Sequence, residues 1–481
     1  MIFLNNFLLR HSIKLIKRTC TSNISALSRE ERVQFLRKMA LPKSRENPII
    51  MKLDTPEFNS IFNDELRALI SIFKEYGYEI RIAGGAVRDL LMGKRPKDLD
   101  FATTATPTQM KEMFTSENVR MINANGEKHG TITPRINDKE NFEVTTLRID
   151  VLTDGRHAEV QFTTDWLLDA LRRDLTINSM FLSFDGSVYD YFFGLDDLQK
   201  HRVAFVGNAV TRIQEDYLRI LRYFRFYGRI ALEPDKHEEE TLKAIKDNAS
   251  GLQNVSGERI WMELKKILEG RFAGELMVVM VENSLAPYIG TETIIPYILY
   301  YYILFLGLPD NPDLSELRRV WKQSGHLNLN AITVISSLLK TVDDAKALHS
   351  RLKLSAYERD LALYIIENRT PKLHPKPLMP FQQQILKSIS KPENTKKMAV
   401  EVLKYNNSPY WKDLENWQIP KFPLSGILLK ERGVEGGKVM GLVMTELKHF
   451  WADNDFNLSN EDLLKELPRV LNMIADRKKR K

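Results

Sequence analysis

The chain has 481 residues, of which 43% are hydrophobic and 28% are charged, with 23 glycines and 20 prolines. This composition is typical of a globular protein and excludes collagen-like, mucin-like and wholly disordered chains. At roughly 100–200 residues per domain, the length allows three or four domains, or one compact domain with extensions. The single cysteine, Cys20, excludes an intramolecular disulfide and a cysteine-based zinc or iron–sulfur site, which favours a reducing compartment.

The formal net charge of +7 comes from the two ends of the chain. Residues 1–29 hold five basic residues and no acid, and residues 477–481 are all basic. Removing five charges at each end leaves −3 for residues 30–476. The overall basicity is therefore no evidence for nucleic-acid binding, and any basic surface has to be local.

The first 29 residues interleave apolar side chains with arginine, lysine and hydroxyl residues. This pattern predicts a mitochondrial presequence, and we expect residues 1–45 to be presequence or disordered, with a matrix location. A disordered basic tail or a weak secretory signal are the alternatives, and Arg10 and Lys14 interrupt the apolar run too early for the latter. Later starts at Met39 or Met51 would give nuclear and cytoplasmic forms.

No segment is predicted to cross a membrane. The most apolar stretch, residues 294–308, is interrupted by Pro296 and is too short for the ~20 apolar residues that a spanning helix needs. We expect a buried helix there instead.

Hydrophobic periodicity divides the chain into a mixed α/β part and a helical part. Helical spacing over 57–77 is followed by strand-like runs, and helical spacing dominates from about residue 205. The expected fold class is α+β: a head with a mixed β-sheet and helices, then an elongated all-α remainder. The expected strands are 78–83, 131–136, 142–149, 158–162 and 179–184, and the first helices of the remainder are 209–230, 236–248 and 257–269.

Residues 81–93 (RIAGGAVRDLLMG) are typical of a strand, a Gly-Gly turn and a helix. Without Cβ atoms, Gly84 and Gly85 let backbone N–H groups approach an anion, and Arg88 follows one turn later. A tight strand–helix connection is the alternative for this motif alone.

Asp98 and Asp100 lie on a short apolar/acidic alternation, in which residues i and i+2 share one strand face. Two neighbouring carboxylates beside a phosphate-binding turn suit Mg²⁺, which prefers oxygen ligands. Glu143 is a candidate third carboxylate. The alternatives are a solvated loop for the aspartates and an exposed strand position for Glu143.

Two basic segments follow. Arg172 and Arg173 precede Asp174 and Asn178, and we expect Arg173 to bind phosphate while Asp174 and Asn178, at i and i+4 of one helix, bracket ribose hydroxyls. A helix-surface ion pair with caps is the alternative.

Asp216, Arg219, Arg222 and Arg225 recur at every third residue of the second segment. An adjacent aspartate and arginine offer an acceptor beside a donor, which matches the Watson–Crick edges of cytosine and adenine and opposes those of uracil and guanine. Each mismatch would leave polar groups unpaired, at roughly 1–3 kcal/mol per group. If this helix faces a nucleotide, Asp216 and Arg219 would select CTP and ATP.

Together these motifs resemble, in order and spacing, those of the class II tRNA nucleotidyltransferases, the CCA-adding enzymes of the polymerase-beta superfamily. Asp190–Leu198 resembles the family's hinge motif, with Tyr191 where many bacterial relatives have proline. The resemblance covers about residues 78–270. It implies a five-stranded head at 52–200, a helical neck at 201–270 that recognises the base, a body at 271–400, and a tail at 401–481 that binds tRNA.

The resemblance further implies template-independent addition of C, C and A to the tRNA 3′ end. Transferred by position, Gly85 and Arg88 contact the triphosphate and Asp98 and Asp100 hold Mg²⁺. Arg173 lies near the ribose or phosphate, Asp216 and Arg219 recognise the base, and Arg222 and Arg225 support that recognition or contact phosphate. Residues 147–158 would belong to a mobile element used in switching from C to A. The alternatives are a bacterial-type poly(A) polymerase and a non-catalytic tRNA-binding relative.

Overall fold

The computed structural model describes residues 27–40, 44–122, 124–154, 157–289, 291–292, 305–306, 308, 312–371, 374–388 and 391–479. The chain divides into two compact units. The first runs to Phe272 and includes Val279–Tyr288, and the second comprises Ala273–Val278 and the chain from Ile289 onward. The expected four-part division stays a prediction.

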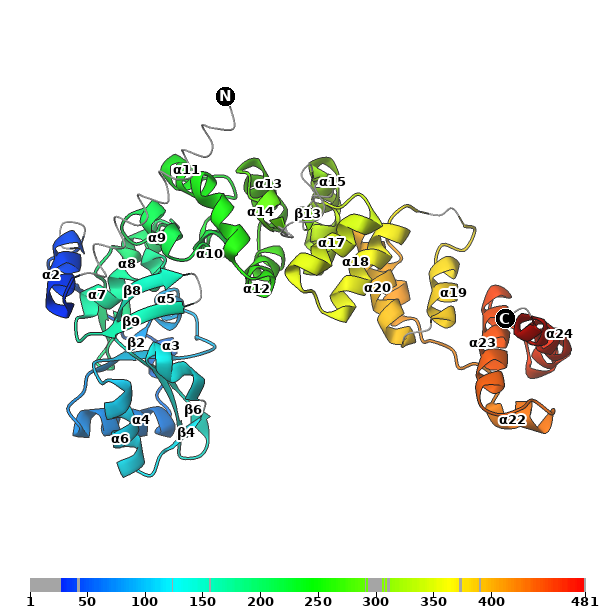
Figure 1. The fold of residues 1–481 in the computed structure, drawn as a ribbon, viewed down its shortest axis with the longest axis horizontal. Helices are drawn as coiled ribbons and strands as arrows, with labels where there is room; N and C mark the ends of the chain where they lie inside the picture. The colour runs from blue at the N-terminus through cyan, green and yellow to red at the C-terminus, as the bar shows by residue number, and fades with distance from the viewer. Residues whose placement is uncertain are drawn as a thin grey trace, which may run out of the picture. The chain divides into compact units, whose positions relative to one another are not determined.

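A mixed sheet forms the centre of the first unit (Figure 1). Its strand order is β1-β11-β10-β2-β3-β7-β5-β4, with β6 paired to β5, and β3 and β7 are the parallel pair. In the described residues this sheet has nine strands rather than five, because short strands extend both edges. The strands are β1 (Ile49–Lys52), β2 (Ile80–Ala83), β3 (Asp100–Thr103), β4 (Arg120–Ile122), β5 (Thr131–Ile136), β6 (Glu140–Asn141), β7 (Glu143–Thr146), β10 (Phe181–Leu182) and β11 (Ser187–Tyr189).

Both faces of the sheet are covered, so successive residues of β3 enter different cores. Phe101 packs into the core formed with α4 and α6, whereas Ala102 packs into the core formed with α7. Because side chains alternate along a strand, Asp100 lies on the same face as Ala102, towards α7. The helices of the head are α3 (Pro56–Asn59), α4 (Asp64–Glu75), α5 (Gly85–Leu91), α6 (Pro107–Ser116) and α7 (Trp166–Leu171).

Two predicted elements are each split in the structure. The helix expected over 57–77 is α3 and α4, because the Asn63 side chain caps α4 by accepting from the Leu66 N–H at 2.8 Å. The strand expected over 142–149 becomes β7 and the start of β8 (Arg148–Asp154), which pairs with β9 (His157–Phe162) in a separate hairpin.

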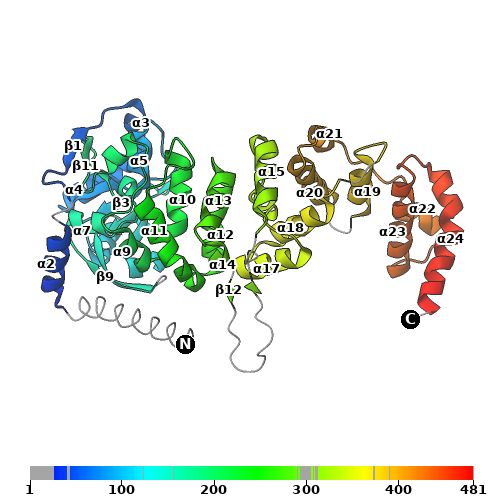
Figure 2. The ribbon, with the colours of Figure 1, turned by 90° about the horizontal axis from the view of Figure 1, so that it is seen from above.

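A helix precedes the sheet, where the sequence predicts presequence or disorder. This helix, α2 (Arg29–Ala40), lies beside α7 (Figure 2). Arg32 donates to the Gln161 side chain at 2.9 Å, and Arg37 is 3.2 Å from Asp165. Residues 29–40 therefore pack on the head, while residues 1–26, the main part of the predicted presequence, lie outside the described residues.

The predicted hinge motif comprises a tightly bonded loop after β11 and most of α8 (Gly194–Gln199). The Asp190 carboxylate, fully buried, accepts from the N–H groups of Phe192, Gly194 and Leu195 at 2.9–3.2 Å. A Cβ on Gly194 would lie 2.3 Å from the Thr176 carbonyl oxygen, so only glycine fits there. Arg45 pairs with Asp190 and Asp196 and lies 4.4 Å from the centre of the Phe193 ring.

Further helices of the first unit follow α8. They are α9 (Ala209–Glu215), α10 (Arg219–Ile230), α11 (Glu239–Asn248) and α12 (Gly257–Leu268). The helix expected over 209–230 is interrupted, because the Asp216 carboxylate accepts from the Leu218 N–H at 3.1 Å and ends α9.

The described part of the second unit is helical apart from one short strand pair, β12 (Thr291–Glu292) with β13 (Phe305–Leu306). Most of the apolar stretch 294–308 lies outside the described residues. None of the described helices is long and apolar enough to cross a membrane.

Leu447 and Trp451 of α23 pack with Leu463 and Leu467 of α24, the two helices seen side by side in Figure 2. The helices after α12 are α13 (Ala273–Glu282), α14 (Ala286–Ile289), α15 (Leu314–Ser324), α16 (Ala331–Ser336), α17 (Val342–Leu352), α18 (Ala356–Asn368), α19 (Met379–Lys387), α20 (Pro392–Tyr405), α21 (Trp411–Asn416), α22 (Gly426–Glu431), α23 (Lys438–Asp453) and α24 (Asn460–Lys479).

Candidate active site

Three carboxylates gather where β3 and β7 begin. Asp100 is the first residue of β3 and is in register with Glu143, the first residue of β7. Asp98 lies on the bend before β3, so the prediction that it belongs to the strand is wrong. Partial desolvation, then the charges of Glu143 and Asp98, raise the pKa of Asp100, and the Arg173 guanidinium opposes that shift.

This cluster fits a divalent cation that takes its remaining ligands from a substrate. After burial, the like charges of Glu143 and Asp98 raise the pKa of Asp100, and a bound cation would oppose that effect. Within the described parts of the chain, no three His, Cys, Asp or Glu side chains are arranged to hold a metal by themselves. Mg²⁺ is commonly held by one or two carboxylates together with substrate phosphates and water.

The Gly84-Gly85 turn lies against Arg173. Gly84 has φ +66°, and a Cβ there would be 2.9 Å from an Arg173 guanidinium nitrogen. The same nitrogen donates to the Asn178 carbonyl oxygen at 3.3 Å. Glycine is therefore required both for the backbone conformation and for the approach of the guanidinium.

Asp169 fixes Arg173 and its neighbour. Its buried carboxylate accepts from Arg172 at 2.9 Å, from Arg173 at 3.1 and 3.2 Å, and from the Arg148 N–H at 3.1 Å. Burial alone would raise the pKa of Asp169, but the charges of Arg172 and then Arg173 hold it below its usual value. Asp169 is not among the predicted site residues, although its spacing of three and four residues from the arginines is the sequence signal for such an ion-pair arrangement.

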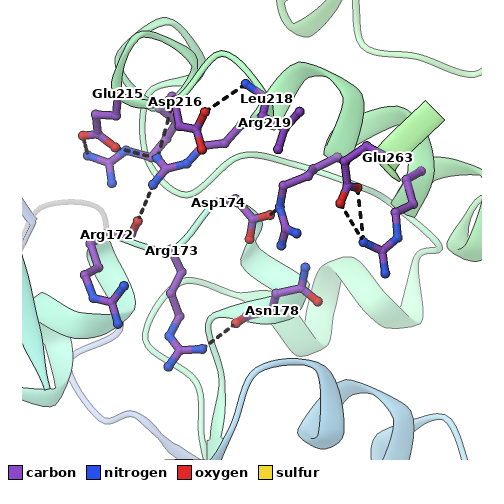
Figure 3. A network of polar contacts seen from close by, with 12 residues as sticks. Arg172, Arg173, Asp174, Asn178, Glu215, Asp216, Leu218, Arg219 and Glu263 are labelled. Atoms are coloured by element: carbon purple, nitrogen blue, oxygen red, sulfur yellow. Dashed lines mark hydrogen bonds and ion pairs between the residues drawn. The ribbon is translucent and has the colours of Figure 1, made fainter. Parts of the chain in front are cut away.

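Asp174 and Asn178 do not share a helix face, which corrects the prediction. Helix α7 ends at Leu171, and Asn178 closes the separate 3-10 turn Thr176–Asn178. Asp174 accepts from Arg222 at 2.6 Å, and the Arg222 charge is the largest factor that offsets burial and lowers the pKa of Asp174. Figure 3 shows Arg173, Asp174 and Asn178 facing a common polar region.

Arg88 is not an open anion-binding side chain. It is 3% exposed, donates to Asp89 at 2.8 and 3.0 Å and to the Asn178 side-chain oxygen, and lies 4.8 Å from the centre of the Phe226 ring. Burial lowers its pKa, while Asp89 opposes the shift. These contacts join α5 to α10, so the predicted triphosphate contact of Arg88 lacks support from its position.

Asp216 and Arg219 are close in the chain but are not ion-paired with each other. Arg219 donates to Glu215 at 2.5 Å and to the Arg172 carbonyl oxygen at 2.9 Å (Figure 3). Asp216 ends α9 and accepts from Arg259 of α12 at 2.8 Å. The prediction that both lie on one helix is therefore wrong for this structure, because Asp216 ends α9 and Arg219 begins α10.

The other two arginines of the predicted base-recognition set are held by acids from other segments. Arg222 pairs with Asp174 as described, and Arg225 donates to both oxygens of Glu263 at 3.1 and 3.2 Å. Arg225 also lies 5.0 Å from the centre of the Phe226 ring. Figure 3 shows Glu263 at the edge of the same region that holds Asp216 and Arg219.

The ion pairs of this region are called here the arginine cluster. Ten arginines pair with seven acids, and the carboxylate of Asp100 lies close enough to Arg173 for the two charges to interact. Guanidinium groups are suited to planar or phosphate-bearing anions. Its members are Arg88, Arg148, Arg172, Arg173, Arg212, Arg219, Arg222, Arg225, Arg229 and Arg259 with Asp89, Asp150, Asp169, Asp174, Glu215, Asp216 and Glu263.

The chain matches two family models. Residues 80–204 match the poly A polymerase head domain, and residues 236–293 match the probable RNA and SrmB-binding site of polymerase A. The first range contains the carboxylates and the Gly84-Gly85 turn. The head therefore belongs to a group of nucleotidyltransferases that generally depend on a metal.

Known proteins resemble the chain over most of its length. The human mitochondrial CCA tRNA nucleotidyltransferase 1 is 48% identical over 438 residues, which cover 90% of this chain and 96% of the human protein. The Bacillus stearothermophilus CCA-adding enzyme in complex with CTP has a similar fold, with a TM-score of 0.61 at 23% identity over 89% of this chain and all of that one. The Thermotoga maritima CCA-adding enzyme with tRNA gives a TM-score of 0.57 at 19% identity, covering 88% and 99%. With the carboxylates, the glycine turn and the arginine cluster all present in a chain so similar to the human enzyme, this protein belongs to the class II CCA tRNA nucleotidyltransferases.

Proposed function

We propose that this nucleotidyltransferase adds C, C and A stepwise to the 3′ end of tRNA, taking CTP and ATP as substrates, using Mg²⁺ and releasing pyrophosphate. The observation that carries the proposal is the placement of Asp100 and Glu143 in register beside Arg173 of the arginine cluster. Solved relatives were obtained with CTP and with tRNA, which supports the choice of substrates.

In each step the tRNA 3′-oxygen forms a bond to the α-phosphorus of the nucleotide, and the bond to the leaving pyrophosphate breaks. Asp98 and Asp100, with Glu143 as a third carboxylate, would hold the cation, which lowers the negative charge on the reacting phosphate when bound. Arg173, held by Asp169 beside the Gly84-Gly85 turn, binds and orients the triphosphate. The guanidinium groups of the cluster offset part of the negative charge of the triphosphate.

The base would be selected by Asp216 and Arg219, with Arg222 and Arg225 behind them. Both Asp216 and Arg219 already have protein partners, which hold them in place but leave further bonding positions. A carboxylate has about four lone-pair sites and a guanidinium five N–H groups, so each side chain can still bond a base. Asp174 and Asn178 would contact the ribose or order the arginines, and Arg88 supports Asn178 rather than the triphosphate.

The test supplies purified protein and Mg²⁺ with three tRNA transcripts, ending before CCA, after C and after CC, and with each NTP singly and in pairs. We expect addition of C, C and A that then stops. Long A tails without C incorporation would indicate a poly(A) polymerase, and tRNA binding without any transfer would indicate a non-catalytic relative.

We also propose that the acid-free first 29 residues direct the chain to the mitochondrial matrix, as the name of the human relative supports. Starts at Met39 or Met51 would give the nuclear and cytoplasmic forms. Localisation of tagged chains beginning at each methionine tests this proposal.

A further inference from the structure

Two arginines lie opposite each other at one edge of the head sheet, outside the arginine cluster. Strand β4 is the last in the sheet order, and its register with β5 places Arg120 directly opposite Arg135. Directly opposite residues have Cβ atoms roughly 5 Å apart, so two like charges there destabilise the strand pair. An anion bound between the two guanidinium groups would relieve that repulsion. These two residues are called the edge pair.

No acid of the described residues forms an ion pair with either side chain of the edge pair. Arg120 is exposed, and its guanidinium has no hydrogen-bond partner within the described chain. Arg135 donates to the Asp138 carbonyl oxygen at 3.0 Å and to the Asn141 side-chain oxygen at 3.1 Å, which are both uncharged acceptors. These bonds hold the Arg135 guanidinium in place and use only part of its five N–H groups. The edge pair is therefore equipped to bind an anion.

The edge pair lies on the sheet face that carries the carboxylates of the candidate active site. Ile136 of β5 and Val144 of β7 both pack into the core formed with α4 and α6. Because side chains alternate along a strand, their neighbours Arg135 and Glu143 lie on the other face. Asp100 is in register with Glu143 and shares that face. The positive charges of the edge thus continue the surface on which the cation would sit.

The edge pair is near the carboxylates but separate from them. The antiparallel register of β5 with β7 continues to Thr133 opposite Glu143, and Arg135 is two residues further along β5. At about 4.8 Å between strands and 3.4 Å per residue, the backbone of Arg135 is about 8 Å from that of Glu143. A ligand that ends at the carboxylates would therefore pass the two guanidinium groups.

Nucleotide transfer requires its two substrates to approach the reacting phosphorus from opposite sides. The attacking oxygen and the leaving pyrophosphate are roughly in line in such a displacement. The sheet order places β2, which leads into the Gly84-Gly85 turn beside Arg173, on one side of β3. Strands β7, β5 and β4 lie on the other side. With the triphosphate oriented by Arg173, the RNA 3′ end has to arrive from the side of the edge pair.

We propose that Arg120 and Arg135 bind the backbone phosphates next to the 3′ end of the tRNA and so hold its terminal hydroxyl at the cation site. This inference rests on the proposed function and assigns an RNA contact to the edge of the head, apart from the cluster that takes the nucleotide. Guanidinium groups match phosphate oxygens in charge and geometry. Contacts to phosphates fix the position of a nucleic acid without reading its sequence, as an enzyme that extends many tRNAs requires.

The experiment measures kcat/KM for a tRNA transcript lacking CCA, at saturating CTP and over a range of KCl concentrations, with the full-length chain. In the double variant Arg120→Gln/Arg135→Gln we expect kcat/KM for tRNA to fall about 10-fold, while KM for CTP stays within about 2-fold. The slope of log kcat/KM against log KCl concentration should become shallower by about 0.7 for each arginine removed, because each contact to a single-strand phosphate contributes about that amount.

Three single variants serve as controls. Arg67→Gln removes an exposed arginine from α4, which covers the other face of the sheet, and should keep the wild-type kcat/KM and slope. Arg120→Lys keeps the charge and should keep the slope, which a role in packing alone does not predict. Arg120→Gln decides the question if the double variant does not fold, because Arg120 bonds no other side chain in the described chain.

The two proposals fail in different ways. A wild-type protein that transfers neither C nor A overturns the proposed function. A wild-type protein that adds CCA, with Arg120→Gln unchanged in kcat/KM for tRNA and in salt slope, overturns only the role of the edge pair. A higher KM for CTP with an unchanged salt slope also overturns that role, because the arginines would then act on the nucleotide rather than on the RNA.

Discussion

Replacing Asp169 by Asn should cost the first unit a large part of its stability. The Asp169 side chain is 1% exposed, and those of Arg172 and Arg173 are 18% and 19% exposed, so water screens these ion pairs poorly. Asn keeps the shape but removes the charge between two guanidinium groups and directs an N–H₂ donor at one of them. Removing one partner from a buried ion pair costs about 3–5 kcal/mol.

That cost is large beside the roughly 5–15 kcal/mol by which domains are stable. For a unit of this size it corresponds to a decrease in Tm on the order of 10 °C. Scanning calorimetry of the full-length chain measures this decrease in Tm. The method is suitable because it can separate the transitions of two compact units that unfold independently. Glu233→Gln is the control: that carboxylate is 62% exposed and 4.0 Å from Lys236, so its loss should cost less than about 1 kcal/mol.

The same substitution should lower kcat about 100-fold, since Arg173 would no longer be fixed beside the Gly84-Gly85 turn. Single-turnover addition of CMP to tRNA measures this effect at a temperature where the variant is folded. An Asp169→Asn protein with wild-type Tm and kcat would refute the argument that this carboxylate organises the arginines.

Three further outcomes are expected. Asp100→Asn should lower kcat for nucleotide transfer by about 1,000-fold or more, while tRNA binding in a filter assay stays near wild type. A normal kcat would show that Asp100 does not hold the metal. A chain that begins at Met51 lacks the contacts of Arg45 with the predicted hinge motif and should unfold at a lower urea concentration than one that begins at Met39. Arg45→Ala in the longer chain should reproduce part of that loss. Equal urea midpoints of the two chains would contradict this prediction. Burial lowers the pKa of His237 to about 4, so the unfolded chain takes up this proton at a higher pH than the folded chain does. The free energy of unfolding should therefore fall by about 2 kcal/mol between pH 6.5 and pH 4, a figure reduced because the imidazole is partly exposed. His237→Gln should flatten that pH dependence in urea titrations, and an unchanged slope would exclude His237 as its source.

The sequence by itself determined the parts of the site that depend on neighbours in the chain. The strand ending at Gly84-Gly85 and the strand position of Asp100 follow from glycine conformation and short-range alternation, and the structure has β2, a Gly84 with positive φ and Asp100 at the start of β3. The family resemblance rests on these local patterns, and the close similarity to the human enzyme confirmed it.

Only the tertiary structure decided which charged groups meet. Asp100 and Glu143 are brought together by the parallel register of β3 and β7, and Asp216 meets Arg259 from 43 residues away rather than Arg219 three residues on. Helical spacing predicts contacts only along an uninterrupted helix, and the Asp216 side chain ends that helix by bonding the Leu218 N–H. Ion-pair partners across packed segments depend on how buried faces dock, and no local pattern in the sequence encodes that choice.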